Sequence, residues 1–368
     1  MLKYLKKYWF FCLLAPLFMV GEVAMDLLQP DLMADIVDNG VLKSDFPLII
    51  NVGIRMILTV IVVAVCGVYL LLNAHPEKPK LFRYILSRRI PTLMVMLIAA
   101  FSIGSASIIF QSIINNRIVT PCLLGMNSMY TLVHTAVVFV VGSGSVLATN
   151  ANLSFAIDLL VMSVSATFVY SYMFKKTGNN VLYVLLIGTV LSSFFGSIQS
   201  TMIRVMDPNE YDTLLTTLVA DFNNVNAEVI VFSLLILTAL TVFLWKDLML
   251  LDVITLGKDQ AINLGVDYDR TVRRLLLGVV LCIAVATAMV GPISFLGLII
   301  ANLARQFLKT YRHVELIVGS ALMGMLAIIA GQLISQHVFS YAVPISTFIT
   351  IGGGIYFLYL LLFKKGGI

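Results

Sequence analysis

Charged residues are scarce in this chain of 368 residues: Asp, Glu, Lys and Arg make up 12% of it, whereas 60% is hydrophobic. Soluble domains carry about 25% charged residues, so a soluble globular protein is excluded. The mean hydropathy of +1.00 predicts an all-α polytopic membrane protein, because helices satisfy their own backbone hydrogen bonds inside a bilayer. The net charge of +5 needs no nucleic acid to explain it, since membrane proteins concentrate Lys and Arg in short cytoplasmic loops.

Motifs for catalysis and for metal or nucleotide binding are also missing. The chain contains no HExxH and no Gly-x-Ser-x-Gly, and Gly257-Lys258 lacks the glycine-rich loop and the following Ser or Thr of a nucleotide-binding P-loop. The cysteines lie in apolar segments without paired spacing, so we expect buried thiols rather than disulfides or ligands. His134 lies in an apolar segment and is expected to be packed or hydrogen-bonded. We therefore expect no catalytic residue, no metal site and no cofactor. The four cysteines are Cys12, Cys66, Cys122 and Cys282.

Eleven apolar segments are candidate helices. About 20 residues span the hydrocarbon core of a bilayer, and most of these segments approach that length almost without charge. The last ten predict a ten-helix core, and the first predicts one extra N-terminal apolar helix. The segments are 8–24, 48–72, 91–114, 122–142, 154–173, 180–203, 228–245, 275–290, 293–304, 314–335 and 343–363.

Loop charges predict the orientation of these helices. If the helices alternate, the basic loops that contain Lys175, Lys246–Arg274 and Arg305–His313 fall on one side, which is expected to be cytoplasmic. The loops on the opposite side are neutral or acidic, with one exception. Alternation places loop 73–90 outside, although it carries Lys78, Lys80, Arg83, Arg88 and Arg89.

The stretch 291–305 is the most informative part of the chain. Gly291 and Pro292 break an apolar run that is too long for one crossing, so they mark a tight turn between two membrane helices. Together with Gly297, this stretch resembles a signature of the permease subunits of binding-protein-dependent ABC importers for iron–siderophores, haem and cobalamin. It has Ala301-Asn302 where those permeases usually have Pro-His.

Residues 256–266 give the fullest match to the same family. They lie in a loop that is too polar to span, and apolar residues on both sides of Gly257 predict two short helices bent at this glycine. The resemblance implies that the loop docks in a groove of a cytoplasmic ATPase subunit, a recognition mode known for small apolar helices. A surface-lying amphipathic helix without a partner is the alternative. The expected coupling residues are Leu256, Gly257, Ala261, Leu264, Gly265 and Val266.

Arg88 and Arg89 precede Pro91 at the start of a predicted helix, where the family has Arg-Leu-Pro-Arg on the outer face. The resemblance implies that these arginines meet acidic residues of an extracellular binding protein, because guanidinium groups pair with carboxylates through two parallel bonds. Such a role also explains the basic outer loop 73–90. Anchoring at the membrane interface is the alternative. Thr92 stands where the family has its second Arg, so Arg89 is expected to make the main contact, with help from Arg88.

Further matches indicate residues of the translocation pathway or of helix contacts. Gln111, near a helix end, either bonds to another helix or lines the pathway. Asn115-Asn116-Arg117 followed by Thr120-Pro121 resembles the branch that imports catecholate siderophores, and small residues near the C-terminus allow close helix packing. These candidates are Gln111, Asn116, Pro121, Gly125, Gly291, Pro292, Gly297, Pro344, Gly352 and Gly353.

Residues 1–47 do not follow the importer pattern. They resemble the first transmembrane helix of an ABC exporter, whereas 48–368 resembles an importer permease, so we expect a fused or mis-joined N-terminal segment. Ten core spans place residue 47 on the positive side, and the lysines before 8–24 favour the same side. Helix 8–24 is therefore expected to lie at the interface or against the core without crossing, or to insert against its charge bias.

The resemblance implies a multi-pass permease subunit of an iron–siderophore importer in a bacterial cytoplasmic membrane. The implied partners are a second permease, either identical or a sister chain, ATP-binding cytoplasmic ATPase subunits, an extracellular binding protein, the iron–siderophore and membrane lipid. The chain itself is expected not to be an enzyme. An exporter domain and an ion-coupled secondary transporter stay open as alternatives. The latter usually needs intramembrane ionisable residues, for which Asp158 is the one clear acidic candidate.

Overall fold

The computed structural model describes residues 32–34, 36, 46–74, 77–145, 150–177, 181–223 and 226–363, and within these ranges its regular secondary structure is helical. The ten predicted core helices are all present, so the all-α fold is confirmed, while segment 8–24 lies outside the described residues. The core helices are α2 (Phe46–Leu71), α3 (Pro79–Ile114), α4 (Met126–Val141), α6 (Ala151–Thr177), α7 (Val181–Val205), α9 (Ala227–Met249), α12 (Tyr268–Val290), α13 (Leu296–Phe307), α14 (His313–His337) and α15 (Ile345–Phe363).

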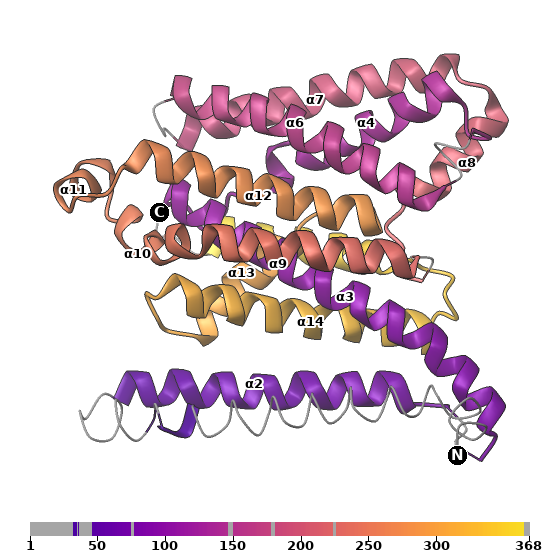
Figure 1. Ribbon diagram of the computed structural model, residues 1–368, viewed down its shortest axis with the longest axis horizontal. Helices are drawn as coiled ribbons and strands as arrows, with labels where there is room; N and C mark the ends of the chain where they lie inside the picture. The colour runs from indigo at the N-terminus through magenta and orange to yellow at the C-terminus, as the bar shows by residue number, and fades with distance from the viewer. Residues whose placement is uncertain are drawn as a thin grey trace.

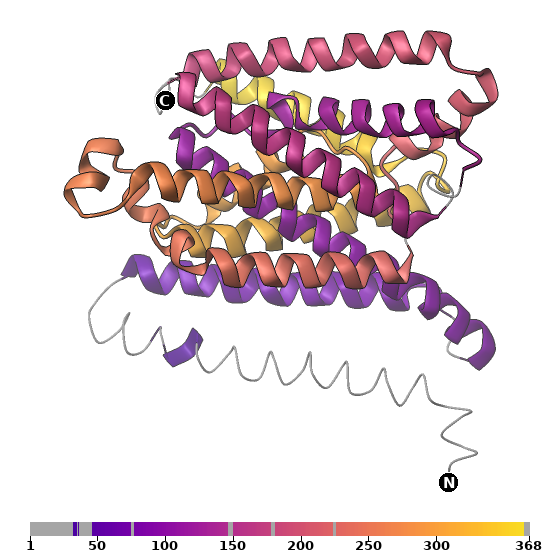
Figure 2. The same ribbon diagram turned by 45° about the horizontal axis from the view of Figure 1, so that its top comes forward.

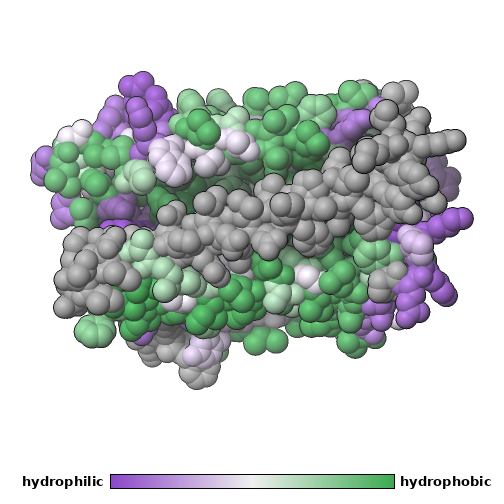
Figure 3. Space-filling model, turned by 60° about the horizontal axis from the view of Figure 1, so that its bottom comes forward, coloured by the Kyte–Doolittle hydropathy of each residue, from purple (hydrophilic) through white to green (hydrophobic). Residues whose placement is uncertain are grey.

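Helix length and surface character both fit a membrane. Within the described residues, seven helices are long and apolar enough to cross a bilayer, and α4, α13 and α15 are shorter apolar helices. An α-helix rises 1.5 Å per residue, so about 20 residues cover a hydrocarbon core ~30 Å thick. On the coloured part of the face in Figure 3, hydrophobic side chains cover the middle and hydrophilic ones gather toward the two ends.

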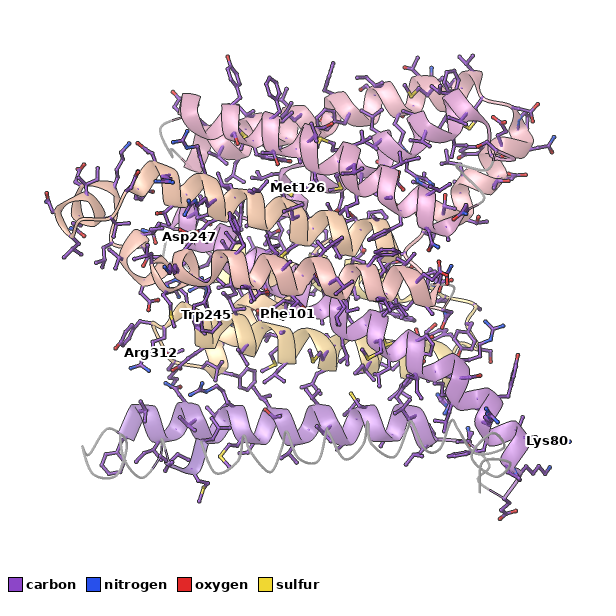
Figure 4. The ribbon with its side chains drawn as sticks, viewed as in Figure 1. Lys80, Phe101, Met126, Trp245, Asp247 and Arg312 are labelled. Atoms are coloured by element: carbon purple, nitrogen blue, oxygen red, sulfur yellow. The ribbon has the colours of Figure 1, made fainter. Side chains whose placement is uncertain are left out.

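Successive core helices run in opposite directions between two ends of the bundle. One end carries α10 (Leu251–Ile254) and α11 (Lys258–Asn263), and the opposite end carries α8 (Pro208–Leu218) and the junction of α2 with α3 (Figure 1). Arg312 and Lys80 mark these two ends in Figure 4. The loops therefore alternate as the sequence predicts. We name the end with α10 and α11 the inner end and the other the outer end, following the positive-inside rule.

Two outer segments differ from the sequence prediction. The expected loop 73–90 is wrong from residue 79 onward, because α3 begins at Pro79 and continues through Pro91. Pro79 lies in the first turn of α3, where proline is well tolerated, and Leu86 on this extension is buried against the bundle. The expected loop between segments 180–203 and 228–245 contains α8, whose N-cap Asp207 accepts a hydrogen bond from the backbone N of Asn209.

Helix α3 forms the centre of the bundle. It packs mainly against α14 and α12. In its most apolar stretch of 18 residues 83% of the residues are buried, compared with 17% in that of α7. Small residues allow this close approach: a Cβ on Gly104 would meet Ser320, and one on Gly324 would meet Ala100. Helices α7 and α2 lie on opposite sides of the bundle in Figures 1 and 2. Their exposed faces are therefore available to lipid or to another chain.

Candidate functional sites at the two ends of the bundle

The six expected coupling residues lie together in a projection at the inner end (Figure 1, left). We call residues 251–266 the coupling projection. Its helices α10 and α11 are the two predicted short helices, and Gly257 joins them with φ 104° and ψ 162°. A side chain at that φ would strain the backbone, whereas glycine accepts it. The predicted bend at Gly257 is therefore present.

A second glycine closes the coupling projection. Gly265 has φ 83° and follows Leu264, the C-cap residue of α11. The backbone N of Val266 donates to the carbonyl of Ala261 at 3.0 Å, and the N of Gly265 donates to the carbonyl of Ile262 at 2.9 Å. This pair of bonds is a Schellman motif, which satisfies the carbonyls left free at a helix end. Both glycines are thus required by the local backbone.

The side chains of the coupling projection divide into anchors and an outward apolar surface. Leu251, Ile254 and Ala261 are buried, so they fix the projection to the bundle. Leu256 and Leu264 are 54% and 63% exposed, although the projection lies beyond the apolar part of the helices. Clustered apolar side chains exposed to water mark an interaction surface.

Polar contacts tie the coupling projection to the membrane helices. Asp252 Oδ1 accepts from the backbone N of His313 at 2.9 Å and lies 2.5 Å from its ring Nδ1, which links α10 to the start of α14. Lys258 Nζ lies 3.0 Å from Asp269 Oδ1 on α12. Because α12 and α14 are the main neighbours of α3, these contacts connect the projection to the helices that pack against the centre of the bundle.

The outer end contains a cavity of about 730 Å³, which we call the outer cavity. It is open to the surface and lined by the ends of α2 and α8, the start of α3, residues 219–223, the end of α14 and the start of α15. Its lining is strongly polar for a membrane protein. The lining side chains include Tyr84, Arg88, Arg89, Asn223, Gln332 and Tyr341.

Arg88 and Arg89 both line the outer cavity, but their surroundings differ. Arg89 Nη1 donates to the carbonyls of Tyr69, Leu70 and Leu72 at 3.0, 3.1 and 2.6 Å, so it caps the C-terminal end of α2. A cation at this position also interacts favourably with the helix dipole. Arg88 is exposed. Arg88 is thus the better placed of the two for a partner, although the sequence favoured Arg89.

The turn at Gly291-Pro292 packs against the outer cavity wall. Gly291 has φ 96°, and a Cβ on it would lie 3.1 Å from Ala220 Cα. The backbone N of Asp221 donates to the carbonyl of Val290 at 3.0 Å, which holds segment 219–223 to the end of α12. The predicted break between two helices is confirmed, since α12 ends at Val290 and α13 begins at Leu296.

The other small candidates lie at close helix contacts or turns. A Cβ on Gly297 would collide with Ser107, and one on Gly353 with Phe295, whereas Gly352 faces open space. Gly125 has φ 97° and meets Ser192 of α7, directly after the 3-10 helix η2 (Pro121–Leu124). The carbonyl of Pro344 accepts from the backbone N of Thr347 and begins α15.

Gln111 and Asn116 hold the connection between α3 and α4. Gln111 is 2% exposed, and its Nε2 donates to the carbonyl of Arg117 at 2.8 Å. The same carbonyl accepts from Asn302 Nδ2 on α13 at 2.9 Å, and Asn116 Oδ1 accepts from the backbone N of Ile118. These bonds favour a structural role for Gln111 over a lining role.

The described residues contain no group of three or more His, Cys, Asp or Glu side chains that could hold a metal ion. Cys66, Cys122 and Cys282 are free thiols, and Cys12 lies outside the described residues. Sequence reasoning missed two features. It did not pair Asp252 with His313, and it did not bring Asn223 and Gln332 into the outer cavity. Polar side chains inside apolar runs, such as Gln332, were the available signal.

Comparisons with known proteins agree with this architecture. The chain is 40% identical over 279 residues to the petrobactin import system permease protein YclO of Bacillus subtilis, covering 76% of this chain and 89% of that protein. It is 30% identical over 315 residues to the petrobactin import system permease protein FatC of Bacillus anthracis, covering 84% and 88%. A solved structure of a metal-chelate type ABC transporter in an inward-facing conformation shares the fold with a TM-score of 0.71 and 20% sequence identity. The superposition covers 86% of this chain and all of that chain.

The family match covers the ten-helix core. It begins two residues into α2 and ends at the last residue of α15. The chain is therefore a multi-pass membrane protein of a transporter family rather than an enzyme. Through residues 48–363, which match the FecCD transport family, this chain belongs to that family.

Proposed function

We propose that this chain is a permease subunit of an ABC importer that carries an iron–siderophore complex across the bacterial cytoplasmic membrane. The observation that carries the proposal is the coupling projection, with exposed leucines held by two glycine turns and linked to α12 and α14. A surface-lying helix would need neither the positive-φ glycines nor the connection to the bundle centre. The names of the two Bacillus relatives favour a petrobactin-type siderophore as the substrate.

The proposed partners follow from the two ends. At the inner end, ATPase subunits bind and hydrolyse ATP and receive Leu256 and Leu264 in a groove; the permease itself needs no cofactor. At the outer end, an extracellular binding protein presents carboxylates to Arg88 and Arg89. A second permease, identical or a sister chain, completes the pathway. We further propose that residues 1–47 are an exporter-like addition to a transmembrane domain formed by 48–368.

Uptake into proteoliposomes tests the function. Permease, ATPase and binding protein encoded by neighbouring genes are reconstituted together, and uptake of a radioactive ferric siderophore is measured. We expect uptake that requires both internal ATP and the binding protein. Uptake driven by a proton or sodium gradient without ATP supports a secondary transporter instead. ATP-dependent movement in the opposite direction supports an exporter.

A further inference from the structure

A polar network joins the buried side chains of α4 and α6 to the exposed residue Thr217 of α8 in the outer half of the bundle. His134 Nδ1 lies 2.7 Å from Asp158 Oδ2, and His134 Nε2 lies 3.0 Å from Thr217 Oγ1. His134 and Asp158 are only 7% and 2% exposed, and Tyr130 stacks on the imidazole with ring centroids 5.9 Å apart. Ionisable residues inside a membrane segment are costly, so this network requires an explanation beyond packing.

The hydrogen-bond donors can be assigned along the network. Thr217 Oγ1 donates to the carbonyl of Leu214 at 2.8 Å, so its oxygen is left to accept from His134 Nε2–H. The short contact between His134 Nδ1 and Asp158 Oδ2 then needs one further proton between them. With that proton, the pair is neutral overall. Neutrality fits the site, because a buried carboxylate without a charge partner is strongly disfavoured.

Thr217 connects this pair to the outer cavity. It lies in the last turn of α8, and the chain continues from there into residues 219–223, which form one wall of the cavity. The far part of this wall is held by Gln332 Nε2, which donates to Asn223 Oδ1 at 2.8 Å. The contact of His134 with Thr217 holds the near part from the bundle side.

We propose that His134 is a positioning residue, which through Thr217 fixes α8 and the cavity wall 219–223 for docking of the binding protein. Asp158 supplies the hydrogen-bond partner that orients the imidazole, and it carries no transported ion. The proposal rests on the proposed function in one respect, namely that the outer cavity receives a binding protein.

The first test removes only the link to α8. Thr217→Val removes one hydrogen bond. We therefore expect the binding-protein concentration that gives half-maximal uptake to rise about fivefold, while the maximal uptake rate is unchanged. Thr213→Val is the matched control, since Thr213 is also exposed on α8 but its hydroxyl donates within the helix, to the carbonyl of Asn209. Equal effects of the two substitutions, or a fall in maximal rate alone, would overturn the proposal.

The second test separates positioning from ion coupling. Asp158→Asn keeps the shape, is neutral and can donate its amide N–H to His134 Nδ1, so it should preserve uptake. Asp158→Ala removes the partner and should reproduce the Thr217→Val phenotype. If Asp158→Asn abolishes uptake, an ionised carboxylate is required and the positioning role is wrong. Protein amount and thermal stability are compared for all variants.

A third readout does not depend on transport. Val219 is 46% exposed in the cavity wall, so Val219→Cys in a cysteine-free chain reports the wall through labelling with a membrane-impermeant maleimide. Thr217→Val should change the labelling rate several-fold, while Thr213→Val should leave it unchanged. If Thr217→Val changes the labelling rate but wild-type uptake does not depend on the binding protein, the proposed function is refuted and the positioning role stands. Unchanged labelling in Thr217→Val would refute the positioning role itself.

Discussion

At the inner end, the coupling projection is one continuous stretch from residue 251 to 266, whereas the outer cavity takes its lining from residues as distant in sequence as Tyr69 and Ile345. The projection depends on local backbone geometry at two glycines. The cavity depends on several helix ends that meet only in the folded chain. A single substitution should therefore disable the inner site, while the outer site should lose function gradually.

The largest effect is expected at the inner end. Gly257→Pro forces φ to about −65° where the chain needs 104°, and Leu264→Asp places a charge on the apolar surface meant for the ATPase. Both should reduce uptake to background while the protein still inserts, because neither position lies in the core. Leu264→Met is the control and should transport normally. Normal uptake in both test variants would contradict the assignment of residues 251–266 as the element that docks to the ATPase.

Graded loss is expected at the outer end. Arg88→Glu and Arg89→Glu should each weaken docking of the binding protein, roughly two- to fivefold for an exposed ion pair, and added salt should weaken docking further. Arg89→Glu should also lower the melting temperature, because it removes the bonds to two carbonyls of α2 and to that of Leu72 directly after it. Binding measured at two ionic strengths, together with thermal unfolding, checks both parts. Cytoplasmic labelling of residues 77–84 would contradict the outer assignment.

Neighbouring glycines of α15 should differ in their effect on stability. A Cβ on Gly353 meets Phe295, so Gly353→Ala should cost roughly 1–3 kcal/mol of unfolding free energy through overpacking. Gly352 has open space, and Gly352→Ala should be neutral or slightly stabilising. Thermal unfolding in detergent compares the two variants. Equal melting temperatures would mean that the side chain of Phe295 moves aside without lowering the free energy of unfolding.

The smallest effect is expected from the N-terminal segment. A chain that begins at residue 48 keeps nearly all of α2 and the whole span matched by the family. Its uptake should stay close to that of the full chain, with equal amounts in the membrane. Loss of transport by a well-expressed truncated chain would show that residues 1–47 belong to the working permease.

Predictions from the sequence were most successful where the residues of one short stretch determine its local backbone structure. Gly257 predicted a bend because positive φ favours glycine, and Gly291-Pro292 predicted a break between helices. Reasoning failed at residues 79–90, where charge suggested a loop, although apolar side chains at helical spacing continue α3. It favoured Arg89 over Arg88 because nothing local reveals that α2 ends against the guanidinium of Arg89.

The sequence by itself determined that the chain is a helical membrane protein with a ten-helix core, which way its loops alternate and where the projection 251–266 lies. These follow from hydropathy, charge and glycine, which act over a few residues. Only the tertiary structure decided that α3 is central and α7 peripheral, that His134 meets Asp158 and Thr217, and that helix ends line the outer cavity. Lipid and protein interiors are equally apolar, so hydropathy cannot distinguish a buried helix face from a lipid-exposed one. Close packing between distant segments makes that distinction.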